Sequence, residues 1–207
     1  MLSLHTIGGE FICGAVIISE AWALTAAHCT YDEPNVYVRA GSRRYDKADN
    51  EHDVIDKHEH HLFSPTTRDY DIALLKVLPR FRYTRTVGNI PFDEFEVNPG
   101  TDAIVSGWGF TETDGDYSDD LLFRVIPTID KSKCEEYFPG KITPRMMCAG
   151  DTDGIGICEG DSGGPLVANG KLVGIVSWRA DPCGSGVPDV YTKIAAVRGW
   201  ISGISGV

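Results

Sequence analysis

Three short segments of the chain carry residue types that together could attack a carbonyl carbon. Ser162 lies in the glycine-rich stretch 160–165, where the backbone can turn tightly and leave the hydroxyl accessible. A serine hydroxyl is a poor nucleophile until a neighbouring base takes its proton, and His28 could be that base. Asp71, immediately before an apolar run, could fix the imidazole tautomer and stabilise its charged form. The combination predicts nucleophilic catalysis, with backbone N–H groups of the glycine-rich stretch holding the substrate oxygen.

Each of these residues has a plainer explanation when it is taken alone. A Gly-Ser-Gly turn is usually only a turn, and an aspartate before a strand is usually a turn or cap residue. A single histidine is usually not catalytic. The functional interpretation therefore depends on structural elements that bring all three residues to one place.

Those elements are predicted to be strands. Runs rich in β-branched and apolar residues, bounded by Gly, Pro, Asn and Asp, occupy residues 11–18, 22–25, 36–39, 72–77, 103–106, 121–126, 166–168 and 172–178. No long amphipathic helices alternate with them, so a doubly wound α/β fold is not expected. One helix is predicted around residues 194–201, where apolar residues recur at helical spacing. The pattern indicates an all-β protein, and residues 89–100 are the best candidate for a connection between two halves.

Composition and charge exclude several classes of function. The formal net charge of −11 argues against nucleic-acid binding, because phosphate groups would be repelled. No apolar run approaches the roughly 18 residues that a membrane-spanning helix needs. Met1 is followed by a short mixed stretch, which predicts that no secretory signal lies within this chain. Residues 58–61 contain three histidines, but neighbouring histidines rarely converge on one ion, so neither a metal nor a cofactor is expected.

The six cysteines lie far apart and form no close CxxC pair, which disfavours zinc and redox sites. An even number of scattered cysteines favours disulfides and an oxidising compartment. Buried free thiols in a cytosolic protein are the alternative. Spacing alone does not fix which cysteines pair.

The catalytic candidates lie in blocks that resemble those of the chymotrypsin- and trypsin-like serine proteases. The signature blocks are residues 25–29 (Thr-Ala-Ala-His-Cys), 71–75 (Asp-Ile-Ala-Leu-Leu) and 160–166 (Gly-Asp-Ser-Gly-Gly-Pro-Leu). They follow that family's order of histidine, aspartate and serine. Supporting blocks are residues 106–109, 147–150, 176–178 and 190–193, so the resemblance runs from about residue 11 to 201.

The resemblance implies a single trypsin-like peptidase domain over residues 1–207, built as two six-stranded antiparallel β-barrels with a short C-terminal helix. The first barrel would span about residues 1–95 and carry His28 and Asp71. The second would span about residues 101–207 and carry Ser162 and the helix. The disulfides implied are Cys13–Cys29, Cys134–Cys148 and Cys158–Cys183.

The same resemblance implies a serine endopeptidase with an acyl-enzyme intermediate. Ser162 would attack the peptide carbonyl while His28 takes its proton, and the N–H groups of Gly160 and Ser162 would form the oxyanion hole. Protein or peptide substrates, protein inhibitors as further partners, secretion as a zymogen and a monomeric state are expected.

The residues expected to line the substrate pocket depart from the family's familiar pattern. Relatives that cleave after Lys or Arg carry an aspartate at the pocket base, where this chain has Gly156. Asp189 instead lies on the adjacent wall, and Arg179 follows Ser177 and Trp178 at the mouth. One hypothesis is that Arg179 reaches and neutralises Asp189, which would narrow the pocket. A plainer one is that Arg179 points to solvent and Asp189 is only a substitution in the wall. The third is that Asp189 is free and attracts Lys or Arg.

The beginning of the chain is the second departure. Mature relatives begin with a sequence like Ile-Val-Gly-Gly, whose ammonium pairs with the aspartate before the nucleophile, here Asp161. Residues 7–10 (Ile-Gly-Gly-Glu) resemble that terminus, but Gly8 and Gly9 rather predict a hairpin turn. The activating terminus is therefore expected upstream of Met1. This leaves an alternative function, a catalytically weak or inactive homologue that acts as a binding protein.

Overall fold

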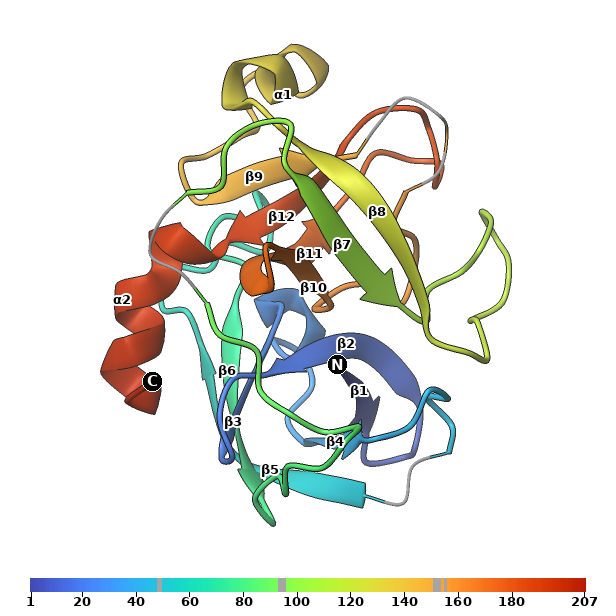
Figure 1. Ribbon diagram of the computed structural model, residues 1–207, viewed down its shortest axis with the longest axis vertical. Helices are drawn as coiled ribbons and strands as arrows, with labels where there is room; N and C mark the ends of the chain where they lie inside the picture. The colour runs from blue at the N-terminus through green and yellow to red at the C-terminus, as the bar shows by residue number, and fades with distance from the viewer. Residues whose placement is uncertain (48–49, 93–95, 151–153, 155) are drawn as a thin grey trace.

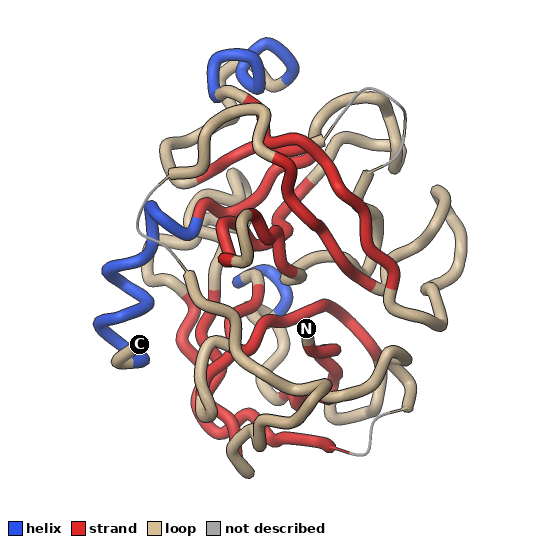
Figure 2. The backbone as a smooth tube through the Cα atoms, in the orientation of Figure 1, coloured by secondary structure: helices blue, strands red, loops and turns tan. Residues whose placement is uncertain are grey.

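The computed structural model describes residues 1–47, 50–92, 96–150, 154 and 156–207. Figure 1 shows two barrels, one above the other, with one helix along their side and a second at the far end of the upper barrel. Strands make up most of the regular structure, as the tube in Figure 2 makes plain. The predicted all-β class is confirmed.

The first barrel is a closed, antiparallel sheet of six strands in the order β1-β2-β3-β6-β5-β4. Its strands are β1 (Leu2–Thr6), β2 (Phe11–Ile17), β3 (Trp22–Thr25), β4 (Val36–Ala40), β5 (Asn50–Glu59) and β6 (Ala73–Leu78). Pairing of β1 with β4, in which Leu4 lies opposite Val38, closes the barrel. The predicted hairpin between β1 and β2 is confirmed, with Gly9 at a φ of 89° that a side chain would disfavour.

The second barrel repeats this plan with six later strands in the order β10-β11-β12-β9-β8-β7. Its strands are β7 (Asp102–Gly107), β8 (Leu122–Ile129), β9 (Met146–Ala149), β10 (Pro165–Ala168), β11 (Lys171–Trp178) and β12 (Asp189–Lys193). Pairing of β10 with β7, in which Val167 lies opposite Ile104, closes it. The predicted connection between halves lies between β6 and β7, and its residues 93–95 fall outside the described part of the chain.

In the described part of the chain, two α-helices accompany the barrels. The predicted C-terminal helix is α2 (Ile194–Ser205), which ends at Gly206 in the left-handed conformation. The other, α1 (Lys131–Tyr137), begins at Asp130, whose carboxylate accepts a hydrogen bond of 2.8 Å from the backbone N–H of Ser132. Among the described residues, no helix is long and apolar enough to cross a membrane.

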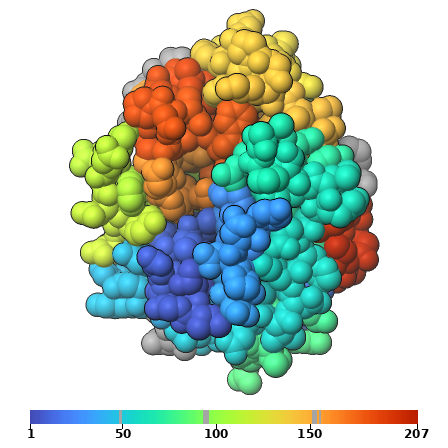
Figure 3. Space-filling model, turned by 180° about the vertical axis from the view of Figure 1, so that it is seen from behind, coloured from blue at the N-terminus to red at the C-terminus, as the bar shows by residue number. Residues whose placement is uncertain are grey.

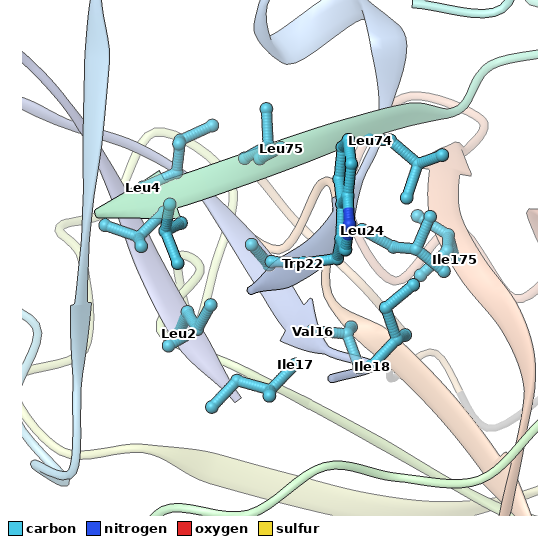
Figure 4. Close-up of a cluster of buried hydrophobic side chains, with 14 of the residues drawn as sticks. Leu2, Leu4, Val16, Ile17, Ile18, Trp22, Leu24, Leu74, Leu75 and Ile175 are labelled. Atoms are coloured by element: carbon cyan, nitrogen blue, oxygen red, sulfur yellow. The ribbon is translucent and has the colours of Figure 1, made fainter. Parts of the chain in front are cut away.

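The largest hydrophobic cluster belongs mainly to the first barrel but extends beyond it. Buried side chains from β1, β2, β3 and β6 fill the interior, and Ile175 of β11 packs beside them (Figure 4). The helix α2 contributes Ile194, Val197 and Ile201 to the same cluster. This shared core holds the two barrels together and therefore fixes the relative positions of the loops between them.

Candidate active site

His28 follows and Asp71 precedes two adjacent strands of the first barrel, and the two residues meet at the end of that strand pair. His28 lies in a single 3-10 turn, η1 (Ala27–Cys29), soon after β3, and Asp71 lies shortly before β6, which pairs with β3. The imidazole Nδ1 is 2.7 Å from Asp71 Oδ2, and the backbone N–H of His28 donates to Asp71 Oδ1 at 2.9 Å. Asp71 is completely buried. A buried carboxylate in this position holds the ring orientation and favours the charged imidazolium.

Ser162 is presented by a tight turn of the second barrel immediately before β10. Gly160 and Gly163 have φ values of 92° and 77°, which L side chains rarely adopt. The carbonyl of Ser162 accepts a hydrogen bond of 2.8 Å from the backbone N–H of Gly14, in the first barrel. This bond fixes the turn against β2 and so sets its position relative to His28.

One cleft contains both His28 and Ser162, with a volume of about 480 Å³. Figure 3 shows this face of the molecule, where blue and blue-green segments of the first barrel meet orange segments of the second. Within the described chain, no hydrogen bond joins His28 Nε2 to Ser162 Oγ. Such catalytic bonds are often long without substrate and shorten in the complex.

Asp161 turns away from this cleft into the second barrel. Its carboxylate accepts hydrogen bonds of 2.9 Å from the backbone N–H groups of Gly109 and Cys158. Burial raises the pKa of Asp161 to about 6. A Cβ atom on Gly107 would lie 1.8 Å from the carboxylate, so the glycine makes room for it. A cavity of about 270 Å³, with Phe123 and Ile157 in its walls, lies beside the carboxylate.

Asp189, the first residue of β12, is almost fully buried against the segment before the nucleophile. Its carboxylate accepts a hydrogen bond of 2.9 Å from the backbone N–H of Ile157. A Cβ atom on Gly156 would lie 2.6 Å from Asp189 Oδ2, so the carboxylate lies directly over the glycine. Burial, with a smaller contribution from the charge of Asp161, raises the pKa of Asp189 to about 7.

Comparison with known proteins gives the family of this double barrel. A family model described as Trypsin matches residues 1–201, which is nearly the whole chain. This chain belongs to the trypsin family. Its trypsin and kallikrein relatives are serine endopeptidases, so the predicted enzyme class is confirmed at the level of the family.

Individual relatives agree with the family assignment. Trypsin 5G1 of Aedes aegypti is 35% identical over 212 residues, covering 100% of this chain and 80% of its own length. Human kallikrein-8 is 36% identical over 207 residues, covering 96% and 79%. The solved structure of neuropsin, a serine protease expressed in the limbic system of mouse brain, superposes with a TM-score of 0.93. It is 34% identical and covers 99% of this chain and 93% of its own.

Three disulfides brace this trypsin-family fold. The bond Cys13–Cys29 joins β2 to the turn that carries His28, and Cys134–Cys148 joins α1 to β9. The bond Cys158–Cys183 ties the segment before Ser162 to the loop between β11 and β12. These are the pairs that the resemblance to the family implies, and they fit an oxidising compartment.

Arg179 does not neutralise Asp189. Its guanidinium donates to both carboxylate oxygens of Glu159, each at 3.2 Å, and to Asp181. The hypothesis of an Arg179–Asp189 pair is therefore wrong. The physical reason is that Glu159 and Asp181 lie at the exposed rim, where an ion pair forms without carrying the guanidinium into the barrel.

The remaining residues expected in the pocket divide between two places. Trp178 and Arg179 line the same cleft as His28, whereas Gly156 lines the cavity beside Asp161. Ser177 also lines the cleft, but its hydroxyl donates to Asp71 Oδ2 at 2.6 Å. Its contact with the buried carboxylate was not expected from the sequence.

A further brace on the Asp71 segment was not found from the sequence. Tyr70 adopts a φ of 54°, an uncommon conformation for a residue with a side chain. Arg145, from the second barrel, lies with its guanidinium carbon 4.7 Å from the centre of the Tyr70 ring and donates to Asp69 from Nε at 3.0 Å. His60 stacks on the same ring at 4.3 Å. These contacts hold the loop that presents Asp71.

The turn around Ser162 gives a first testable prediction. A Cβ atom on Gly163 would lie 2.2 Å from Thr25 Oγ1 and 2.3 Å from the carbonyl oxygen of Gly14. We expect Gly163→Ala to lower the free energy of unfolding by about 3 kcal/mol or more, because overpacking adds to the strain of positive φ. Urea denaturation measures this change.

Gly170 is the matched control for that substitution. It has a similar φ of 73°, but no atom would lie within 4 Å of an added Cβ. Gly170→Ala should therefore cost only about 1–2 kcal/mol, from backbone strain alone. Equal losses in the two variants would show that the packing around Gly163 is not as close as described.

Proposed function

We propose that this chain hydrolyses peptide bonds in proteins through an acyl-enzyme intermediate, with Ser162 as nucleophile, His28 as base and Asp71 as orienting carboxylate. The main support is the pairing of His28 with the buried Asp71 at 2.7 Å, beside a glycine-supported serine in the same cleft. Membership of the trypsin family supports the same chemistry.

In the proposed first half-reaction, Ser162 Oγ attacks the peptide carbonyl while His28 Nε2 takes its proton. The N–H groups of Gly160 and Ser162 stabilise the oxyanion, and His28 then protonates the leaving amine. In the second half-reaction, water attacks the acyl-enzyme with His28 again as base. The positive φ of Gly160 supports this arrangement, because it turns the peptide without placing a side chain over the cleft.

An organophosphate that reacts with activated serines tests the proposed site. Only a serine with an organised base reacts rapidly, so we expect stoichiometric labelling of Ser162, located by mass spectrometry of the digested protein. His28→Ala should abolish the labelling. A folded chain that remains unlabelled would favour the other function, that of a homologue without catalysis which acts by binding a partner.

We further propose that Asp161 receives a peptide ammonium in the cavity beside it. An ammonium would compensate a buried carboxylate whose hydrogen bonds, among the described residues, come from two backbone N–H groups. Pairing there would fix Asp161 and therefore the neighbouring Gly160 and Ser162, which supply the oxyanion donors. The dipeptide Ile-Val, added to the labelling reaction, should then accelerate it.

We propose that Asp189 gives the substrate pocket its preference, for Lys or Arg before the scissile bond. Two observations support this proposal. Asp189 forms no ion pair with any described residue, and its carboxylate lies over Gly156 at the expected pocket base. Since Arg179 is held at the rim by Glu159, it leaves this carboxylate available to a cationic substrate.

The raised pKa of Asp189 predicts that the preference depends on pH. The carboxylate attracts a cation only when it is deprotonated, and this fraction grows as the pH rises through about 7. The ratio of kcat/KM for an Arg substrate to that for a Leu substrate should rise about tenfold between pH 6 and pH 8. Taking the ratio cancels any pH effect on the catalytic step that the two substrates share.

The variant Asp189→Ser controls for other titrating groups. Its ratio should be low and nearly independent of pH, since the pocket then lacks the carboxylate. A parent protein whose ratio is the same at both pH values would contradict the assignment of Asp189.

Location and partners follow from the same proposal. The three disulfides favour an oxidising compartment, and we propose an extracellular site of action on protein or peptide substrates. Binding of protein inhibitors at the cleft and a monomeric state stay predictions.

A further inference from the structure

We propose that a second cavity, adjoining the catalytic cleft, binds an acidic side chain of the substrate through Arg68 and Lys141. The cavity has a volume of about 770 Å³. It shares a wall with the cleft, because Arg68, Trp178 and Arg179 line both. A substrate held at Ser162 can therefore reach it with a residue only a few positions from the scissile bond. Its role in substrate choice rests on the proposed peptidase function.

The charges in this cavity do not cancel. Its two carboxylates are already bound, Asp69 by Arg145 and Thr143, and Asp181 by Arg179. The side chains of Arg68 and Lys141 form neither an ion pair nor a hydrogen bond with any described residue.

Two uncompensated cations therefore face this cavity in a protein whose formal net charge is −11. Because the rest of the acidic surface repels an acidic peptide, this positive site determines where such a peptide can bind.

Arg68 is held in place rather than carried on a free loop. Its φ is 58°, and its backbone N–H donates to the carbonyl of Ser64 at 2.8 Å. The next residues, Asp69 and Tyr70, are fixed by Arg145 as described above. The backbone that carries the guanidinium is thus ordered before substrate arrives, which lowers the entropic cost of binding.

Part of the lining of the cavity is apolar. Phe138 and Trp178 pack edge to face, with ring centres 4.9 Å apart. Such a wall can cover the methylene groups of a glutamate while its carboxylate meets Arg68. It also reduces access of water, which strengthens the attraction between opposite charges.

Binding without turnover tests the proposal directly. In the Ser162→Ala protein, we would titrate a set of fluorescent peptides that all contain the same Arg. Each peptide carries a single Glu, placed at one of the three positions before or the three positions after that Arg. Each peptide has a counterpart with Gln in place of Glu. At low salt, Glu should bind about fivefold more tightly than Gln at one or two neighbouring positions, the gain of an ion pair near a protein surface. The difference should shrink at 0.5 M salt.

Variants locate the effect. Arg68→Ala should remove most of the preference for Glu, and Lys141→Ala should reduce it about twofold. Arg82→Ala is the matched control, because it removes an exposed arginine from another loop and changes the net charge equally. It should leave the preference unchanged. Equal affinities of the Glu and Gln peptides at every position, or an equal loss in Arg82→Ala, would overturn the proposal.

The same peptides separate this proposal from the peptidase function. If the chain with Ser162 intact binds Glu peptides selectively but cleaves none of them, the acidic site stands and the peptidase proposal fails. If it cleaves Glu and Gln peptides with the same kcat/KM and binds them equally, the peptidase proposal stands and the acidic site is overturned.

Discussion

Replacing Ser162 with Ala should abolish hydrolysis of casein while the protein remains folded. Without the hydroxyl no acyl-enzyme can form, and loss of the nucleophile alone from such a triad costs on the order of 10⁶ in kcat. The side chain of Ser162 takes part in no hydrogen bond within the described chain, so its removal should leave stability nearly unchanged. Casein turnover tests the loss of activity, and the melting temperature of the same preparation tests whether stability is unchanged.

Ser205→Ala, at the end of α2 and far from the cleft in sequence and fold, controls for preparation and handling. It should retain full turnover. Casein cleavage by purified Ser162→Ala at the rate of the parent would show that another residue, or another protein in the sample, carries the activity.

Asp71→Asn should reduce kcat by about 10⁴ at neutral pH, with a much smaller change in KM. The carboxylate now faces His28 Nδ1 and also accepts from the backbone N–H of His28 and from Ser177. An amide would offer an N–H to Nδ1 and favour the tautomer with its proton on Nε2. That tautomer cannot take the proton from Ser162.

Asp102→Asn is a suitable comparison, because Asp102 is an exposed residue at the start of β7 and its change should leave kcat intact. If Asp71 had only a structural role, its replacement would lower the stability and the yield of active enzyme. It would not lower kcat calculated per Ser162 that reacts with the organophosphate. Retention of more than a tenth of the parent kcat in Asp71→Asn would contradict the orienting role.

The fold was predictable where a run of apolar side chains indicates a strand that is buried on both faces. All eight predicted runs overlap strands of the two barrels, because their apolar residues, such as Leu74 and Ile175, are buried. The strand β5 was missed because its sequence, Asn-Glu-His-Asp-Val-Ile-Asp-Lys-His-Glu, is polar. Its pairing with β4 and β6, rather than its own hydrophobicity, makes it a strand. The helix α1 was missed because only Cys134 within it is buried.

The candidate triad could be chosen from the sequence because its residues lie in distinctive local blocks. The partners of charged side chains could not, because they come from residues distant along the chain and depend on rotamers. Arg179 illustrates this, since the sequence suggested Asp189 as its partner and the folded chain pairs it with Glu159 and Asp181. The same holds for Arg145, whose contact with Asp69 bridges 76 residues of sequence.

The packing of α2 constrains the order in which the protein can fold. During synthesis the strands of the first barrel leave the ribosome early, but Ile194, Val197 and Ile201 of α2 complete its hydrophobic cluster only after all twelve strands have emerged. The disulfide Cys13–Cys29, which spans 16 residues, can close long before that point. The hydrophobic cluster of the first barrel therefore stays partly exposed until these distant residues arrive. We expect slow folding that benefits from chaperones, rather than folding barrel by barrel.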